Sequence, residues 1–140
     1  MSALEVLWHY RQAFADGFLV TLQLLVLATL IGTITGGALE WLCARLGSGI
    51  RLVVDSAAFA VTTIPALVIL FWLHYPAQAM LGIVIHPFWT ALTTLTIINA
   101  FAIYRIIADA VHDFPMQYIA TALVSGLSKR SIFRYIYAPL

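Results

Sequence analysis

The stretch FPMQYIATALVSGLSKRSIFRYIYAPL, residues Phe114–Leu140, decides the expected fold, because it is the longest segment outside the apolar runs that is still patterned like structure. Residues Met116–Ser125 are good helix formers with apolar residues at helical spacing. Gly126 follows, and glycine readily takes the left-handed conformation that ends a helix. Ser128 suits the amino-terminal cap of a second helix, Lys129–Ala138. The pattern predicts a short helix, a glycine turn and a second short helix.

The whole chain has the composition of a membrane protein. Of its 140 residues, 63% are hydrophobic and 9% are charged, with a mean hydropathy of +0.99. A soluble domain typically carries about a quarter charged residues. The net charge of +1 gives no sign of a nucleic-acid surface, and the single cysteine, Cys43, excludes an internal disulfide. We therefore expect an all-α integral membrane protein in contact with membrane lipid, with no nucleic-acid partner.

Three apolar runs are long enough to cross a bilayer, which takes about 20 residues of helix. The second run contains Pro65, and we expect the hydroxyls of Thr62 and Thr63 to bond carbonyls that the proline leaves free. Residues 74–87 contain turn residues and indicate a loop. The predicted organisation is an external amino-terminal segment 1–17, a transmembrane region 18–113 with spans at about 18–42, 53–73 and 88–107, and the segment 114–140.

The distribution of Lys and Arg predicts the orientation, because short cytoplasmic loops carry more of these residues than external ones. The amino-terminal segment has one, the loop at 43–52 has two, the loop at 74–87 has none, and the segment 114–140 has three. We therefore expect the amino terminus outside the cell and the segment 114–140 in the cytoplasm.

Small residues recur along one face of the first span, at Ala28, Gly32 and Gly36. Such spacing lets two helix backbones approach closely. One interpretation is a packing face toward another span or a partner subunit. The other is that glycine is simply common in membrane helices, and the sequence alone leaves both open.

Polar and charged residues of the third span suggest two interpretations. Arg105 and Asp109 are four residues apart and share a helix face, so we expect them to pair, as we do Arg51 and Asp55. With Asn99, the first pair is a candidate substrate path or gate. The simpler interpretation, which we favour, is an ion pair at the span border and interhelical hydrogen bonds from Asn99.

Sequence motifs give no indication of enzymatic chemistry. No glycine-rich loop precedes a Gly-Lys-Ser/Thr sequence, so any ATP must be bound by another subunit. The histidines at positions 9, 74, 86 and 112 do not have metal-ligand spacing. We expect neither a catalytic site nor a metal site, and no cofactor bound by this chain.

The segment quoted first carries a family pattern. Ala120, Thr121 and Ala122 are followed by Gly126 and, further on, by Pro139. This arrangement resembles the cytoplasmic coupling loop of bacterial ABC-importer permeases, in which Glu-Ala-Ala-x-x-x-Gly is followed later by Pro. Ala120 stands where the family has its acidic residue. The opening of the first span, residues 17–23, is similar to that of the polar-amino-acid permease subfamily.

The resemblance implies a partial type I ABC permease fold of three transmembrane helices with a coupling loop. It implies a permease subunit in the bacterial inner membrane that transports amino acids or similar small polar solutes. Its partners would be an ABC ATPase subunit, which binds the ATP, a second permease subunit and an external solute-binding protein. Because the family usually has more than three spans, we expect a fragment, a truncated product or a chain that needs a partner. The alternative is a small structural or assembly subunit without transport activity.

Overall fold

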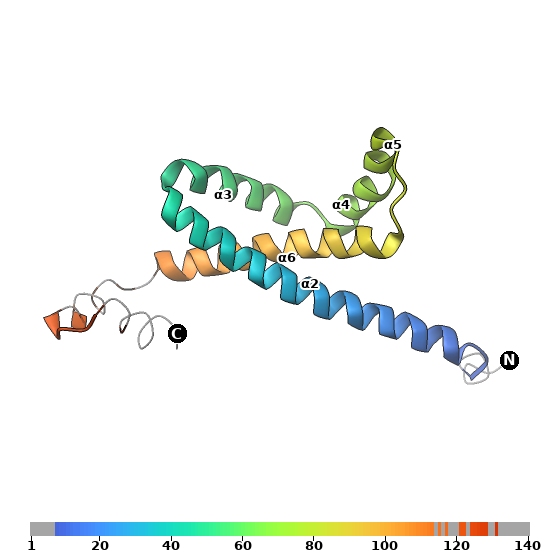
Figure 1. The fold of residues 1–140 in the computed structure, drawn as a ribbon, viewed down its shortest axis with the longest axis horizontal. Coiled ribbons are helices and arrows are strands. Elements are labelled where there is room, and N and C mark those ends of the chain that lie inside the picture. The colour runs from blue at the N-terminus through green and yellow to red at the C-terminus, as the bar shows by residue number, and fades with distance from the viewer. Residues whose placement is uncertain are drawn as a thin grey trace. The chain divides into compact units, whose positions relative to one another are not determined.

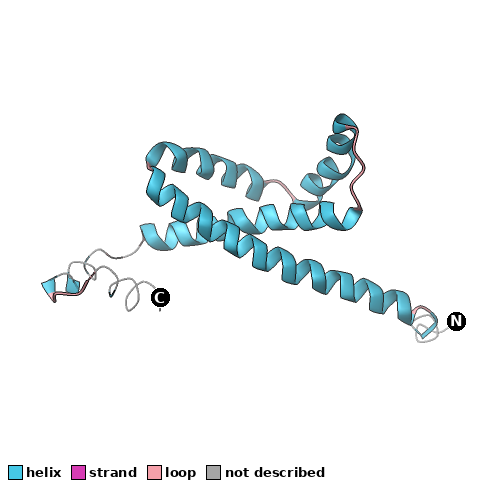
Figure 2. Cartoon of the chain, in the orientation of Figure 1, coloured by secondary structure: helices cyan, strands magenta, loops and turns pink. Residues whose placement is uncertain are grey.

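The computed structural model describes residues 8–113 and, after them, residues 115, 117, 121, 122, 124–128 and 131. Every element assigned in this part of the chain is a helix, which confirms the expected all-α class (Figure 1, Figure 2). The chain divides into two compact units, Met1–Ala108 and Asp109–Leu140. In chain order the helices are α2 (Arg11–Leu46), α3 (Ser48–Thr63), α4 (Ala66–Trp72), the π-helix η1 (Leu73–Ala77), α5 (Gln78–Leu81) and α6 (Pro87–His112).

The first long helix, α2, contains the whole predicted span 18–42 and extends beyond it at both ends. Its 36 residues correspond to roughly 54 Å at 1.5 Å per residue, well over the ~30 Å of a hydrocarbon core. The helix begins at Arg11, so part of the segment predicted to precede the span is already helical. It ends at Gly47, whose φ of 91° breaks the helical hydrogen-bond pattern before α3 starts at Ser48.

The second predicted span is broken. The sequence predicted one run over 53–73, but α3 and the α4–α5 arm meet at an angle of 99°. Pro65 has no N–H to donate and disfavours a helical conformation for Ile64, which is extended at φ −78° and ψ 131°. The hydroxyls of Thr62 and Thr63 bond the carbonyls four residues before them, at Ala58 and Phe59, rather than carbonyls freed by the proline. That part of the sequence-based interpretation was wrong.

Most of the predicted loop 74–87 is helical. The arm continues from α4 through η1 and α5 to Leu81, where Gly82 adopts a left-handed conformation with φ 65° and ends it. Pro76 lies inside η1. Proline has no N–H to donate, so one backbone hydrogen bond of the helix is missing at this position. Residues 83–86 then lead to α6.

The last long helix, α6, spans 26 residues and contains the predicted span 88–107. Its buried residues face the other helices of the first unit, and Tyr104 joins Cys43 of α2 and Ala58 of α3 in one core cluster. By length and composition, α2 and α6 are each able to cross a membrane, and counting the bent α3–α5 pair as one span gives three. Three membrane spans agree with the expected architecture.

The second unit contains the turn predicted from the sequence. Gly126 has a left-handed φ of 78°. The N–H of Leu127 donates to the carbonyl of Ala122 at 3.0 Å, the six-to-one hydrogen bond of a helix end closed by glycine. Ser128 Oγ then accepts from the N–H of Ser131 at 3.2 Å, as an amino-terminal cap does. The predicted glycine turn is confirmed, while the predicted second helix, Lys129–Ala138, lies outside the described residues except for Ser131.

Candidate functional site

The closest approach between long helices is the crossing of α2 and α6. A Cβ built on Gly32 would lie 2.5 Å from Asn99 Nδ2, and one built on Gly36 would collide with the carbonyl oxygen of Ala100. Asn99 Nδ2 donates to the carbonyls of Ala28 and Thr29, at 3.2 and 3.3 Å. The small residues of α2 therefore lie against α6 of the same chain, and Asn99 is used as an interhelical donor.

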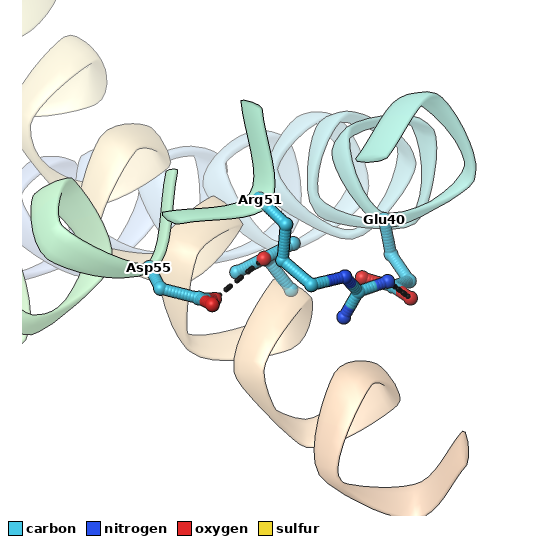
Figure 3. Close-up of polar contacts among 4 residues, drawn as sticks. Glu40, Arg51 and Asp55 are labelled. Atoms are coloured by element: carbon cyan, nitrogen blue, oxygen red, sulfur yellow. Dashed lines mark hydrogen bonds and ion pairs between the residues drawn. The ribbon is translucent and has the colours of Figure 1, made fainter. Parts of the chain in front are cut away.

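Beyond this crossing, four side chains link α2, α3 and α6, and we call them the polar clasp: Glu40, Arg51, Asp55 and Tyr104. Arg51 Nη2 donates to Glu40 Oε1 at 2.6 Å, and the hydroxyl of Tyr104 donates to Asp55 Oδ1 at 2.6 Å. Figure 3 shows the guanidinium of Arg51 turned toward Glu40 and away from Asp55. The expected Arg51–Asp55 pair is therefore not formed.

Burial explains this choice of partners. Glu40 is only 5% exposed and Tyr104 is fully buried. A buried carboxylate needs a cation and a buried hydroxyl needs an acceptor, so Arg51 is drawn to Glu40 and Asp55 to Tyr104. The second carboxylate oxygen, Glu40 Oε2, has no partner among the described residues.

The expected pair of Arg105 and Asp109 is also absent from the described contacts. Both side chains are exposed, and Arg105 Nη1 instead lies 3.4 Å from the hydroxyl of Thr62, near the Pro65 bend. The three residues considered for a substrate path thus do not converge, because Asn99 faces α2 while Arg105 faces α3.

A second polar group holds the bent arm to α6. Gln78 Oε1 accepts from the N–H of Ile85 at 2.7 Å, which fixes Nε2 as the amino side of the amide. That Nε2 lies 3.3 Å from His74 Nδ1 and 3.4 Å from Thr90 Oγ1. His74 Nδ1 also lies 3.2 Å from Thr90 Oγ1, so the three side chains are within hydrogen-bonding distance of one another.

An apolar groove of about 750 Å³ lies between the bent arm and α6. Its walls are almost entirely aliphatic and aromatic, and no charged side chain lines it. Such a surface binds apolar groups and offers nothing to a charged solute. The lining residues are Leu67, Val68, Leu70, Phe71, His74, Tyr75, Pro87 and Ala91.

Sequence reasoning missed three residues that the structure makes important, Glu40, Tyr104 and Gln78. Glu40 carried a usable signal, because it is the only charge in the predicted span 18–42 and an intramembrane charge needs a partner. Tyr104 carried none, since its partner Asp55 is 49 positions away, and Gln78 was missed because residues 74–87 were predicted to be a loop.

The candidate coupling segment is described only in part. Thr121 and Ala122 lie in the turn of helix before Gly126, and Ala122 is buried. Ala120 and Pro139, which complete the expected pattern, lie outside the described residues. Over the part of the chain that the structure describes, no group of three His, Cys, Asp or Glu residues is placed to hold a metal ion.

Comparison with known proteins gives one match. Residues 28–140 match the model of the family described as "Binding-protein-dependent transport system inner membrane component". No curated protein and no solved structure matches the chain. The matched region contains the crossing glycines, the polar clasp, the bent arm and the glycine turn at Gly126. Together with the helical membrane architecture, this match shows that the chain belongs to the family of inner-membrane permease components of ABC-type, binding-protein-dependent transport systems.

Proposed function

We propose that this chain is a permease subunit of an ABC importer for amino acids or similar small polar solutes. In this proposal the segment 114–140 couples the chain to an ATPase subunit, which binds and hydrolyses the ATP. Family membership supports a permease. The observation that supports the coupling role is the glycine turn, in which Gly126 ends a helical turn and Ser128 Oγ accepts from the N–H of Ser131.

The helix before Gly126 is the part proposed to dock. Short amphipathic helices commonly bind by laying one face into a groove of a partner protein. Closure of two ATPase subunits on ATP would then rock this chain and a second permease subunit between inward-open and outward-open states. A solute-binding protein outside the membrane would deliver the substrate.

The proposed orientation follows from charge. Lys129, Arg130 and Arg134 lie in the segment after α6, whereas residues 74–87 contain no Lys or Arg. Because cationic residues are biased toward the cytoplasm, this distribution supports a cytoplasmic location for the segment 114–140, on the side where ATP is available. Labelling of a cysteine placed at Val124, an exposed position, from outside intact cells would contradict the proposal.

The substrate class rests on the resemblance of residues 17–23 to the polar-amino-acid subfamily. Uptake of a panel of radiolabelled amino acids into cells that carry the complete system, with unlabelled sugars and peptides as competitors, tests this class directly. Competition by a sugar or peptide but not by any amino acid would move the proposal to another small polar solute.

Replacement of Gly126 by Val tests the coupling role. A β-branched residue is strained at a φ of 78°, at a cost of roughly 1–2 kcal/mol, so we expect about a tenfold loss of ATPase co-purification and of uptake. Gly49→Val is the matched control, because Gly49 lies in α3 with open space around it and no positive φ. If ATPase binding and uptake are unchanged in Gly126→Val, the alternative of a structural subunit without transport activity is favoured.

A further inference from the structure

Among the described residues, the polar clasp is the only set of polar side-chain contacts that joins α3 to both of the long helices. Arg51 ties α3 to α2 through Glu40, and Asp55 ties α3 to α6 through Tyr104. Arg51 and Asp55 are four residues apart, so they project from adjacent turns of one helix face. One short piece of α3 therefore connects three helices.

The bond from Tyr104 to Asp55 is the stronger link between α3 and α6. It joins a fully buried hydroxyl to a carboxylate at 2.6 Å, within the range of charge-assisted bonds. The tyrosine side of the bond packs against Cys43, Ala58 and Ala108, whereas Asp55 is exposed. The other link, from Arg105 to Thr62, is exposed and long at 3.4 Å. Separation of α6 from α3 would leave the Tyr104 hydroxyl without its acceptor.

Tyr104 lies in the last part of α6, close along the chain to the proposed coupling segment. From Tyr104 the helix continues unbroken to His112, about two turns further on, and the proposed coupling segment follows directly. α6 is therefore the element through which the coupling segment is connected along the chain to Tyr104.

We propose that Tyr104 and Asp55 are positioning residues, which make α6 and the α2–α3 hairpin move as one body when the coupling segment moves. This inference rests on the proposed function. The crossing at Gly32 and Gly36 still holds α6 to α2, so without the bond α3 would lag behind α6, and ATP hydrolysis would continue while solute transport fell. Arg51 and Glu40 keep the hairpin itself together.

The first test measures solute taken up per ATP hydrolysed by the complete transport system in proteoliposomes. Tyr104→Phe removes only the hydroxyl, Asp55→Ala removes the acceptor, and Asp55→Asn keeps an oxygen that accepts. We expect the ratio to fall by about fivefold or more in the first two, the low end of usual coupling between sites, with ATPase co-purification and membrane level unchanged. In Asp55→Asn the ratio of solute taken up to ATP hydrolysed is expected to stay close to that of the wild type.

Two matched controls separate coupling from general damage. Tyr75→Phe removes a hydroxyl from an exposed tyrosine, and Ser56→Ala removes one from the residue after Asp55, where it bonds only its own helix. Both are expected to behave like the wild type. An unchanged ratio in Tyr104→Phe and Asp55→Ala overturns the proposal, and so does a parallel loss of uptake, ATPase activity and protein level.

The second test requires no change to the clasp, so it holds even where a clasp variant fails to fold. Spin labels at Ser56→Cys on α3 and Ile106→Cys on α6 occupy exposed positions, while Cys43 is buried. On ATP binding, the distance from Ile106 to a label on the ATPase is expected to change, and the distance from Ser56 to Ile106 is expected to stay constant. A change in the second distance refutes the one-body movement. Absence of ATPase from the purified wild-type complex refutes the proposed function instead.

Discussion

The crossing of α2 and α6 and the bent arm show two ways in which this chain packs against the same helix. At the crossing, glycines let backbones approach until a single methyl group would not fit. Along the arm, large apolar side chains of α4 and η1 remain exposed and leave a groove of about 750 Å³ beside α6. Between lipid and protein there is little hydrophobic driving force, so close contact has to be built from small residues and hydrogen bonds. The crossing has both, whereas the arm has only the His74–Gln78–Thr90 group.

The strongest expected contrast is between two neighbouring glycines of α2. In Gly36→Ala the new methyl group would collide with the backbone of α6 and would approach Ile103 Cβ to 2.9 Å. Backbone cannot move away as a side chain can, so we expect a loss of stability of about 2–3 kcal/mol. In Gly37→Ala the nearest atom is Ile107 Cδ1 at 3.9 Å, and the better helix propensity of Ala should leave stability equal or slightly higher.

Unfolding in mixed micelles, followed by circular dichroism, measures both variants. Equal effects of Gly36→Ala and Gly37→Ala would show that α2 and α6 do not approach as closely as described.

A smaller effect is expected for Gly32, because the atoms nearest to a methyl group there all belong to the side chain of Asn99, with its Cβ at 2.9 Å, rather than to the backbone of α6. A methyl group there would meet Asn99 Nδ2 at 2.5 Å, so we expect Gly32→Ala to cost about 1–2 kcal/mol. Asn99→Ala removes the two bonds to α2 and should cost about 1 kcal/mol. The double variant should be more stable than the sum of the singles predicts, by about 0.5 kcal/mol or more. If the two single effects simply add in this double-mutant cycle, Gly32 and Asn99 are not in contact and the prediction is wrong.

The smallest effect is expected in the groove. Leu67 is 77% exposed, so Leu67→Ala should change the free energy of unfolding by less than about 0.5 kcal/mol. Leu92 of α6 is 7% exposed, and Leu92→Ala should cost about 2 kcal/mol or more because it leaves a cavity. The same unfolding measurement compares them. A large loss for Leu67→Ala would mean that something covers the groove in the sample.

Local chemistry allowed several features to be predicted from the sequence. The left-handed Gly126 and the capping Ser128 follow from properties of single residues and their neighbours, so no distant contact was needed. The small-residue face of α2 was visible from its spacing, although the sequence could not say which helix would lie against it. The family resemblance came from the same segment as Gly126, and the match over residues 28–140 supports it.

Features that depend on pairing between distant residues could not be predicted. Pro65 was placed inside one continuous span, and the 99° bend beside it depends on how the arm packs on α6, which no local rule contains. Arg51 was assigned to Asp55 because the two are four residues apart. Folding instead buries Glu40 beside Arg51 and Tyr104 beside Asp55, and a buried group binds a partner more firmly than an exposed one does.

The sequence by itself determined that the chain is a helical membrane protein, where its long apolar helices lie, and where the final segment turns. Composition, span length and the backbone preferences of single residues are enough for these properties, since each acts within a few positions of the chain. Tertiary structure alone decided the partners of Glu40, Arg51, Asp55 and Tyr104, the break of the second span, and the contrast between the tight crossing and the open groove. These features depend on which residues become buried when the helices pack, and burial is a property of all the packed helices together.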